Sequence, residues 1–116
     1  MPNTLHSYSN SIRAINFLTE WASTTSKNKG FHDVVFTAEQ AAIITSIALI
    51  GTEVSELLDV YRRDGHHHSP EFRAEGSDIL IRTFDLFGRL GIDLGEATIT
   101  KMVKNESRPR LHGKAF

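Results

Sequence analysis

Four acidic side chains stand in two pairs, and each pair has a spacing of three residues. Glu53 and Glu56 form the first pair, and Glu75 and Asp78 form the second. Residues three apart share one face of an α-helix, so two helices that present these faces to one seam would form a cage of four carboxylates. Buried carboxylates need a positive partner. Oxygen ligands of this kind suit hard cations, Mg²⁺ above all, and leave coordination positions for water and phosphate.

The same acids also have a structural interpretation. A single Glu-x-x-Glu pair on a helix is common, and such acids are often solvated or held in salt bridges. Arg82 lies four residues after Asp78 and could pair with it on the same helix face. A di-iron bundle is excluded, because it needs Glu-x-x-His on two helices and the sequence contains no Glu-x-x-His. The spacing alone therefore leaves a metal site and a salt-bridged face both open.

Four helical segments would position these acids. Apolar side chains recur near the helical period, which predicts helices over residues 9–26 and 37–63, from a Ser69 cap to about residue 90, and from Asp93 to just before Arg108. The second segment is apolar on most sides, which predicts a central, buried helix. No strand-like alternation competes with these periods. The sequence therefore predicts an all-α fold, a helical bundle formed by a single domain over residues 1–116.

Local signals mark the ends of these helices. Thr37 and Gln40 fit a capping box at the start of the second helix. Ser69 would cap the third helix, with Pro70 in its first turn. Gly91 would stop that helix, and Asp93 would cap the fourth in a second capping box with Glu96. The elements are therefore delimited by side chains suited to helix ends.

Composition narrows the class of protein. The chain has 116 residues, of which 40% are hydrophobic and 23% charged, with a net charge of -1 and no cysteine. The charge balance argues against nucleic acid as a partner, and the missing thiols exclude disulfides and thiolate metal sites. No signal peptide is visible, and the longest apolar run, residues 47–50, is too short to span a bilayer. We therefore expect a cytoplasmic protein without a membrane partner, and its small size predicts self-association.

The acid pairs resemble the Glu-x-x-Glu … Glu-x-x-Asp signature of the MazG-like family of all-α nucleoside triphosphate pyrophosphatases. Thr52-Glu53-Val54-Ser55-Glu56 is followed, eighteen residues later, by Glu75-Gly76-Ser77-Asp78. Further matching segments are Gly30-Phe31 and residues 48–50, 79–86, 91–94, 101–105 and 108–114. The resemblance covers residues 29–116 in the order and spacing of the family.

The resemblance implies an oligomeric, four-helix-bundle-like enzyme, a homodimer or homotetramer. Its reaction would convert a (deoxy)nucleoside triphosphate and water into the monophosphate and pyrophosphate, with Mg²⁺ as cofactor and Mn²⁺ as a substitute. The role would be nucleotide-pool housekeeping or that of a dedicated dNTP pyrophosphatase, as some phages encode. Such chemistry depends mainly on positioning the phosphates and neutralising their charge.

Residue roles follow from the same resemblance. The metal ligands would be Glu53, Glu56, Glu75 and Asp78, and either Glu53 or Glu56 would also accept the proton of the attacking water. Lys101 and Asn105 would contact the triphosphate or sugar. The remaining candidate substrate contacts are Arg82, Arg108 and Phe31, of which Phe31 matches a base-contacting aromatic.

Two positions depart from the family pattern. Many relatives carry Glu where this chain has Thr52, and many carry Trp where it has His32. Thr52 keeps alternatives open for the number of metals and for the general base. It also supports a runner-up interpretation, a catalytically weak helical module that binds nucleotides or partners. Nucleic-acid binding through the basic tail is a third alternative, whose mark would be a steep salt dependence.

Overall fold

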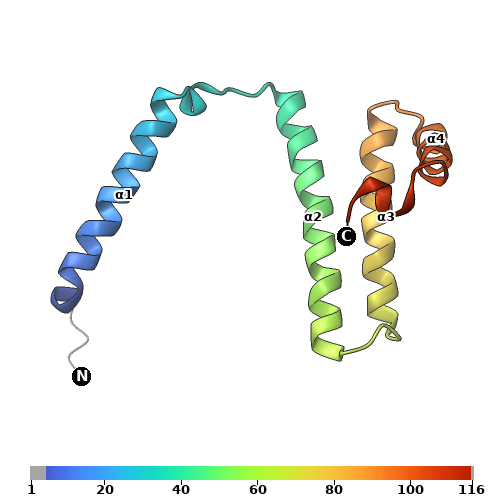
Figure 1. Ribbon diagram of the computed structural model, residues 1–116, viewed down its shortest axis with the longest axis horizontal. Coiled ribbons are helices and arrows are strands. Elements are labelled where there is room, and N and C mark those ends of the chain that lie inside the picture. Colours follow the sequence, from blue (N-terminus) through green and yellow to red (C-terminus); the bar gives the residue numbers. More distant parts are fainter. Residues whose placement is uncertain (1–4, 116) are drawn as a thin grey trace. The chain divides into compact units, whose positions relative to one another are not determined.

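The computed structural model describes residues 5–115. Within these residues 82% of the chain is helical, and no strand is present, so the predicted all-α class is confirmed. The elements are η1 (Leu5–Tyr8), α1 (Ser9–Asn28), η2 (Phe31–Asp33), α2 (Ala38–Asp64), α3 (Pro70–Arg89), α4 (Leu94–Glu106) and η3 (Arg110–Gly113). The four α-helices start and end within two residues of the predicted limits (Figure 1).

The chain divides into two compact units, Met1–Thr37 and Ala38–Phe116. The first unit contains α1 and η2, and none of the described residues of either helix is buried. Gly30, with a φ of 85°, ends the turn that follows α1, a conformation that glycine adopts without a steric penalty. The second unit contains α2, α3 and α4. A single domain over residues 1–116 stays a prediction.

Helices α2 and α3 form an antiparallel hairpin that is the main packing contact of the second unit (Figure 1). The hydroxyl of Ser69 accepts a hydrogen bond from the backbone N–H of Phe72 at 3.1 Å, and Pro70 is the first helical residue. Asp93 caps α4 through the N–H of Glu96 at 2.9 Å. Gly91, with a φ of 67°, follows the end of α3. The predicted helix stop and these two predicted caps are therefore observed.

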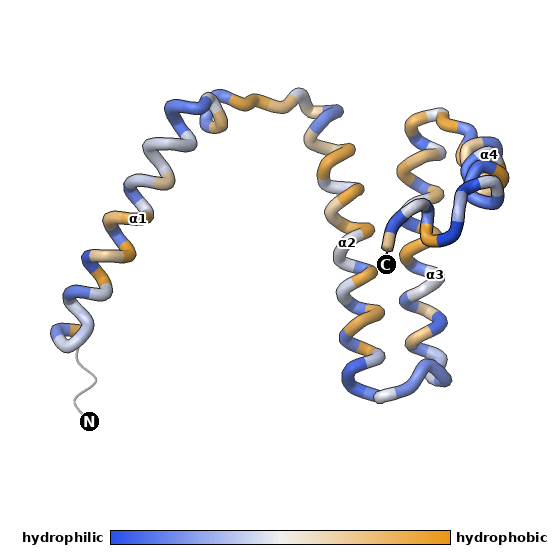
Figure 2. Tube along the Cα trace, viewed as in Figure 1, coloured by the Kyte–Doolittle hydropathy of each residue, from blue (hydrophilic) through white to orange (hydrophobic). Residues whose placement is uncertain are grey.

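The prediction that α2 is buried is wrong for the second unit by itself. Ile44 is 45% exposed and Ile47 is 55% exposed, and the buried residues of α2 are Glu53 and Val60. Hydrophobic positions nevertheless recur along α2 (Figure 2). The physical reason is that one neighbouring helix, α3, covers only one side of a helix that is apolar on most sides. Within the second unit, the α2–α3 hairpin thus leaves apolar side chains of α2 exposed.

By length and composition alone, α2 is also apolar enough to cross a bilayer. Core helices of soluble proteins share this property, so it does not by itself indicate a membrane-spanning helix. The predicted cytoplasmic location without a membrane partner stays a prediction.

The loop between α2 and α3 is held by an ion-pair network. The guanidinium of Arg63 donates to Asp64 at 2.8 and 2.9 Å and to Glu71, across the loop, at 2.8 Å. The hydrogen bond from Arg63 lowers the pKa of the Asp64 carboxyl. One side chain therefore joins the last turn of α2 to the first turn of α3.

We expect Asp64→Asn to lower the melting temperature at neutral pH but not in strong acid. The pKa of Asp64 is lowered from 3.8 in the folded protein. Its contribution to stability is therefore present above pH 3.8 and is lost as the pH falls through the lower, folded-state pKa. The measurement is thermal unfolding of both proteins at neutral pH and well below pH 3.8, with the exposed Asp59→Asn on the same helix as control. Equal melting temperatures at neutral pH would contradict the expectation.

Candidate metal centre

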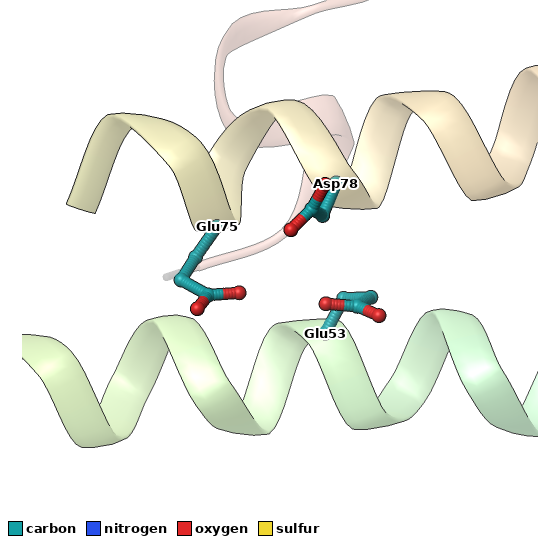
Figure 3. A group of neighbouring side chains, drawn as sticks. All are labelled: Glu53, Glu75 and Asp78. Carbon is teal, nitrogen blue, oxygen red and sulfur yellow. The ribbon is translucent and has the colours of Figure 1, made fainter. Parts of the chain in front are cut away.

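Three carboxylates from two helices converge at the α2–α3 seam. Glu53 on α2 and Glu75 and Asp78 on α3 each offer one oxygen, and these three oxygens all lie within 4.8 Å of one another. Figure 3 shows the two α3 side chains directed toward Glu53 across the seam. Glu53 is 5% exposed, whereas Glu75 and Asp78 are half-buried. The structure thus brings together three of the four predicted metal ligands.

The helical spacing and the hairpin topology produce this convergence. Glu75 and Asp78 are three residues apart, so they lie on one face of α3. The antiparallel pairing brings that face of α3 against the face of α2 that carries Glu53. The cluster is therefore built by two adjacent helices and one short loop.

Glu56 lies at the margin of this cluster. It is exposed, and it is not among the three closely spaced carboxylates. Two effects of Glu53 raise the pKa of Glu56: the larger is a hydrogen bond between the two side chains, and the next is the repulsion of their charges. Glu75 acts in the same direction. The fourth predicted ligand therefore interacts with the cluster from its solvent side.

Arg82 supplies the positive charge beside the acids. Its Nε donates a hydrogen bond to Oε1 of Glu53, which joins α3 to α2. This contact lowers the pKa of Glu53 and raises the pKa of Arg82. The charge of Asp78 adds to the second effect, but the hydrogen-bonded partner of Arg82 is Glu53. The same-helix pairing of Arg82 with Asp78, considered from the sequence, is therefore replaced by a pairing across the seam.

One carboxylate oxygen in the cluster has no hydrogen-bond partner. Oε2 of Glu75 is buried and receives no hydrogen bond from any residue that the structure describes. A buried, unsatisfied carboxylate oxygen is costly. Three converging carboxylates with an unsatisfied oxygen match the oxygen-rich coordination of a hard divalent cation. The donor set therefore fits Mg²⁺ or Mn²⁺.

A groove of about 330 Å³ opens beside the cluster. Its lining residues are Glu53, Asp78, Ile81, Arg82 and Asp85. Asp85 was not among the predicted site residues. Its position seven residues after Asp78, two helical turns along one face of α3, was the signal that could have identified it.

Three other predicted substrate contacts lie on or after α4. Lys101 lines a separate groove along α4, and Asn105 lies on the last turns of the same helix. Arg108 follows α4, and its N–H donates to the carbonyl of Asn105 at 3.2 Å. Phe31 belongs to the first unit, where it lines a groove with Leu18 and other α1 residues. Of the four predicted substrate contacts in the second unit, the structure joins only Arg82 to the acids.

Thr52 stands where many MazG-like proteins carry Glu, and its side chain forms a hydrogen bond within its own helix. Its hydroxyl donates to the carbonyl of Ala48 at 3.3 Å, and the residue is exposed. It therefore adds no carboxylate to the cluster.

Comparisons of the chain with protein-family models, with curated proteins and with solved structures found no match.

Proposed function

We propose that this protein is a Mg²⁺-dependent nucleoside triphosphate pyrophosphohydrolase of the MazG-like, all-α type. The observation that carries the proposal is the convergence of Glu53, Glu75 and Asp78 within 4.8 Å at the seam of two helices. The order and spacing of these acids match the Glu-x-x-Glu … Glu-x-x-Asp pattern. The products would be a nucleoside monophosphate and pyrophosphate.

The chemistry of a triphosphate explains why an acid cluster would serve this reaction. A triphosphate and three carboxylates repel each other, so the two come together only through cations. Glu53, Glu75 and Asp78 would hold Mg²⁺, which would supply charge neutralisation for the phosphates and a more acidic water. The chain itself would fix the ion through Glu53, Glu75 and Asp78, with Glu56 beside them.

Among the acids, Glu56 is the better candidate for accepting the proton of the attacking water. Glu53 is buried and its Oε1 is engaged by Arg82. Glu56 is exposed beside the cluster, where water and substrate reach it. A general base must lie within hydrogen-bond reach of the water that it deprotonates. We therefore assign this role to Glu56 and the ligand role mainly to the three closely spaced acids.

Oligomer formation is part of the proposal. The second unit exposes large apolar side chains on α2 and on α3, among them Ile47, Val54, Leu80, Ile81 and Phe84. Surfaces of this kind mark interfaces when they are contiguous. A homodimer or homotetramer in the cytoplasm would cover them. Lys101, Asn105, Arg108 and Phe31 stay proposed substrate contacts in that assembly.

The test is release of pyrophosphate and monophosphate from the four ribo- and four deoxyribonucleoside triphosphates, with and without Mg²⁺. Wild type is compared with Glu56→Gln and with Glu71→Gln, an exposed acid at the start of α3. We expect Mg²⁺-dependent release from wild type and Glu71→Gln, and loss of release in Glu56→Gln. The profile across substrates would show the preferred base and sugar.

The contrary outcome is equally clear. If no triphosphate is turned over and wild type equals Glu56→Gln, the enzyme proposal fails. The runner-up, a helical module that binds nucleotides without turnover, would then be tested with a non-hydrolysable triphosphate by calorimetry. The absence of a carboxylate at position 52, where the residue is Thr52, is the feature that favours that runner-up.

A further inference from the structure

Arg82 donates to Oε1 of Glu53, and both residues line the groove beside the cluster. The guanidinium is on α3, one helical turn after Asp78, and its Nε reaches across the seam to Oε1 of Glu53. Arginine stays protonated in proteins, so the contact is always between a cation and a carboxylate. Glu53 is 5% exposed and is also one of the three acids whose oxygens converge. The Glu53 carboxylate is therefore a potential partner of two cations, the guanidinium of Arg82 and a divalent metal ion.

A divalent cation and the guanidinium compete for this carboxylate. Both are attracted to the same carboxylate, and the two positive charges repel each other at ligand distances. The acid that Arg82 neutralises is the only one of the cluster contributed by α2. A divalent ion bound to Glu53 would therefore weaken the contact between Glu53 and Arg82.

The structure also indicates where the displaced guanidinium would lie. The Arg82 side chain is 42% exposed and lines the groove beside the cluster. Asp85, the other acid of that groove outside the cluster, is already paired with Arg89 at 3.0 Å. The freed guanidinium would therefore project into the groove, where its planar donors suit a phosphate anion.

We propose that Arg82 is an exchangeable counter-ion, which a divalent ion displaces from Glu53 and which then binds the phosphates of the substrate. This inference rests on the proposed function, because it takes the acid cluster as the metal site. It makes the binding of metal and of phosphate mutually dependent, since the ion releases the arginine that the anion needs. Arg82 thus gains a role that differs before and after the metal binds.

The first test is the affinity for Mn²⁺, measured from the electron paramagnetic resonance signal of the free ion. Arg82→Gln is expected to bind Mn²⁺ about tenfold more tightly than wild type. In the variant, Mn²⁺ binding does not have to break the charge-assisted hydrogen bond between Arg82 and Glu53. The matched control is Arg89→Gln, which removes an arginine seven residues along the same helix that pairs with Asp85 and Ser46. Its Mn²⁺ affinity should equal that of wild type.

The second test is the binding of inorganic pyrophosphate to the Mn²⁺-saturated proteins, measured by calorimetry. Arg82→Gln is expected to bind pyrophosphate about tenfold more weakly than wild type, because a bidentate guanidinium contact is lost. Arg82→Lys, which keeps the charge without the planar fork, should fall between the two. The tighter metal binding and the weaker anion binding of one variant are the signature of an exchangeable counter-ion.

The outcomes separate this inference from the proposed function. If no variant binds Mn²⁺, the metal site and the proposed function fail together. If wild type and Arg82→Gln bind Mn²⁺ equally, or the variant binds it more weakly, the counter-ion role is overturned while the metal site stands. Circular dichroism controls for folding: a variant that folds only when Mn²⁺ is added supports the inference, and one that stays unfolded with saturating Mn²⁺ overturns it.

Discussion

Glu75→Gln is expected to reduce Mg²⁺-dependent pyrophosphate release by roughly 10²–10³-fold, the size of effect found when one preorganised electrostatic group is removed. The same variant is expected to melt at a higher temperature than wild type in EDTA. Glu75 contributes an oxygen to the cluster, and its Oε2 is buried without a hydrogen-bond partner among the described residues. An amide of the same shape removes one charge from three neighbouring acids and can donate to them.

The opposite signs of these two effects distinguish a metal site from a structural acid. Neutralising a carboxylate that only supports the fold would lower the stability of the protein. Neutralising a metal ligand would instead remove repulsion between neighbouring acids and raise the stability of the metal-free protein, at a cost in function. Thermal unfolding in EDTA and in excess Mg²⁺, together with the pyrophosphate assay, measures both effects. Glu71→Gln on the same helix is the control, and it should retain activity. A less stable Glu75→Gln with wild-type activity would refute the metal-site assignment.

Leu86→Ala is expected to lower the free energy of unfolding by about 2–5 kcal/mol, the usual cost of truncating a buried leucine. Leu86 is 5% exposed, and the only other buried apolar residue in the described part of the chain is Val60. Leu86 also lies one turn after Arg82, on the side of α3 that meets α2. Because so few side chains fill the seam, a cavity there should loosen the hairpin that positions the acids.

Urea unfolding followed by helical circular dichroism measures this loss, and Phe84→Ala provides the comparison. Phe84 is 58% exposed, so in a monomer its truncation should change stability by less than about 0.5 kcal/mol. A larger cost for Phe84→Ala that depends on protein concentration would show that a second copy covers this face. A cost below about 1 kcal/mol for Leu86→Ala would contradict the burial of this residue.

The helices could be predicted because their signals are local. The hydroxyl of Ser69, the carboxylate of Asp93 and the positive φ of Gly91 act on the nearest turn of backbone, and all three appear where the sequence indicated. The spacing of Glu75 and Asp78 likewise fixes their shared face within one helix. Convergence with Glu53 required only that the two helices be antiparallel neighbours, which a short loop favours.

Features that depend on contacts between helices could not be predicted in the same way. Apolar side chains on most sides of α2 predicted that the helix is buried. Hydropathy does not show which part of the protein packs against each side, and α3 covers one side only. Arg82 had a same-helix partner in Asp78 by spacing, yet the side chain reaches Glu53 across the seam. Glu56 shares a helix face with Glu53 but remains on its solvent side. In each case a distance between two helices, absent from any single-helix pattern, decided the outcome.

The helical hairpin has a consequence for how the protein folds. The acids and Arg82 lie on consecutive helices joined by the short loop 65–69. Glu53 and Arg82 are 29 residues apart, but once both helices have formed only this loop has to close. Helical proteins, whose contacts are mostly local, fold in microseconds to milliseconds. The carboxylates of Glu53, Glu75 and Asp78 would thus meet early on the folding pathway, where their repulsion opposes hairpin closure. The guanidinium of Arg82 would offset that repulsion during closure, so that the rate of folding as well as the final stability depends on one arginine.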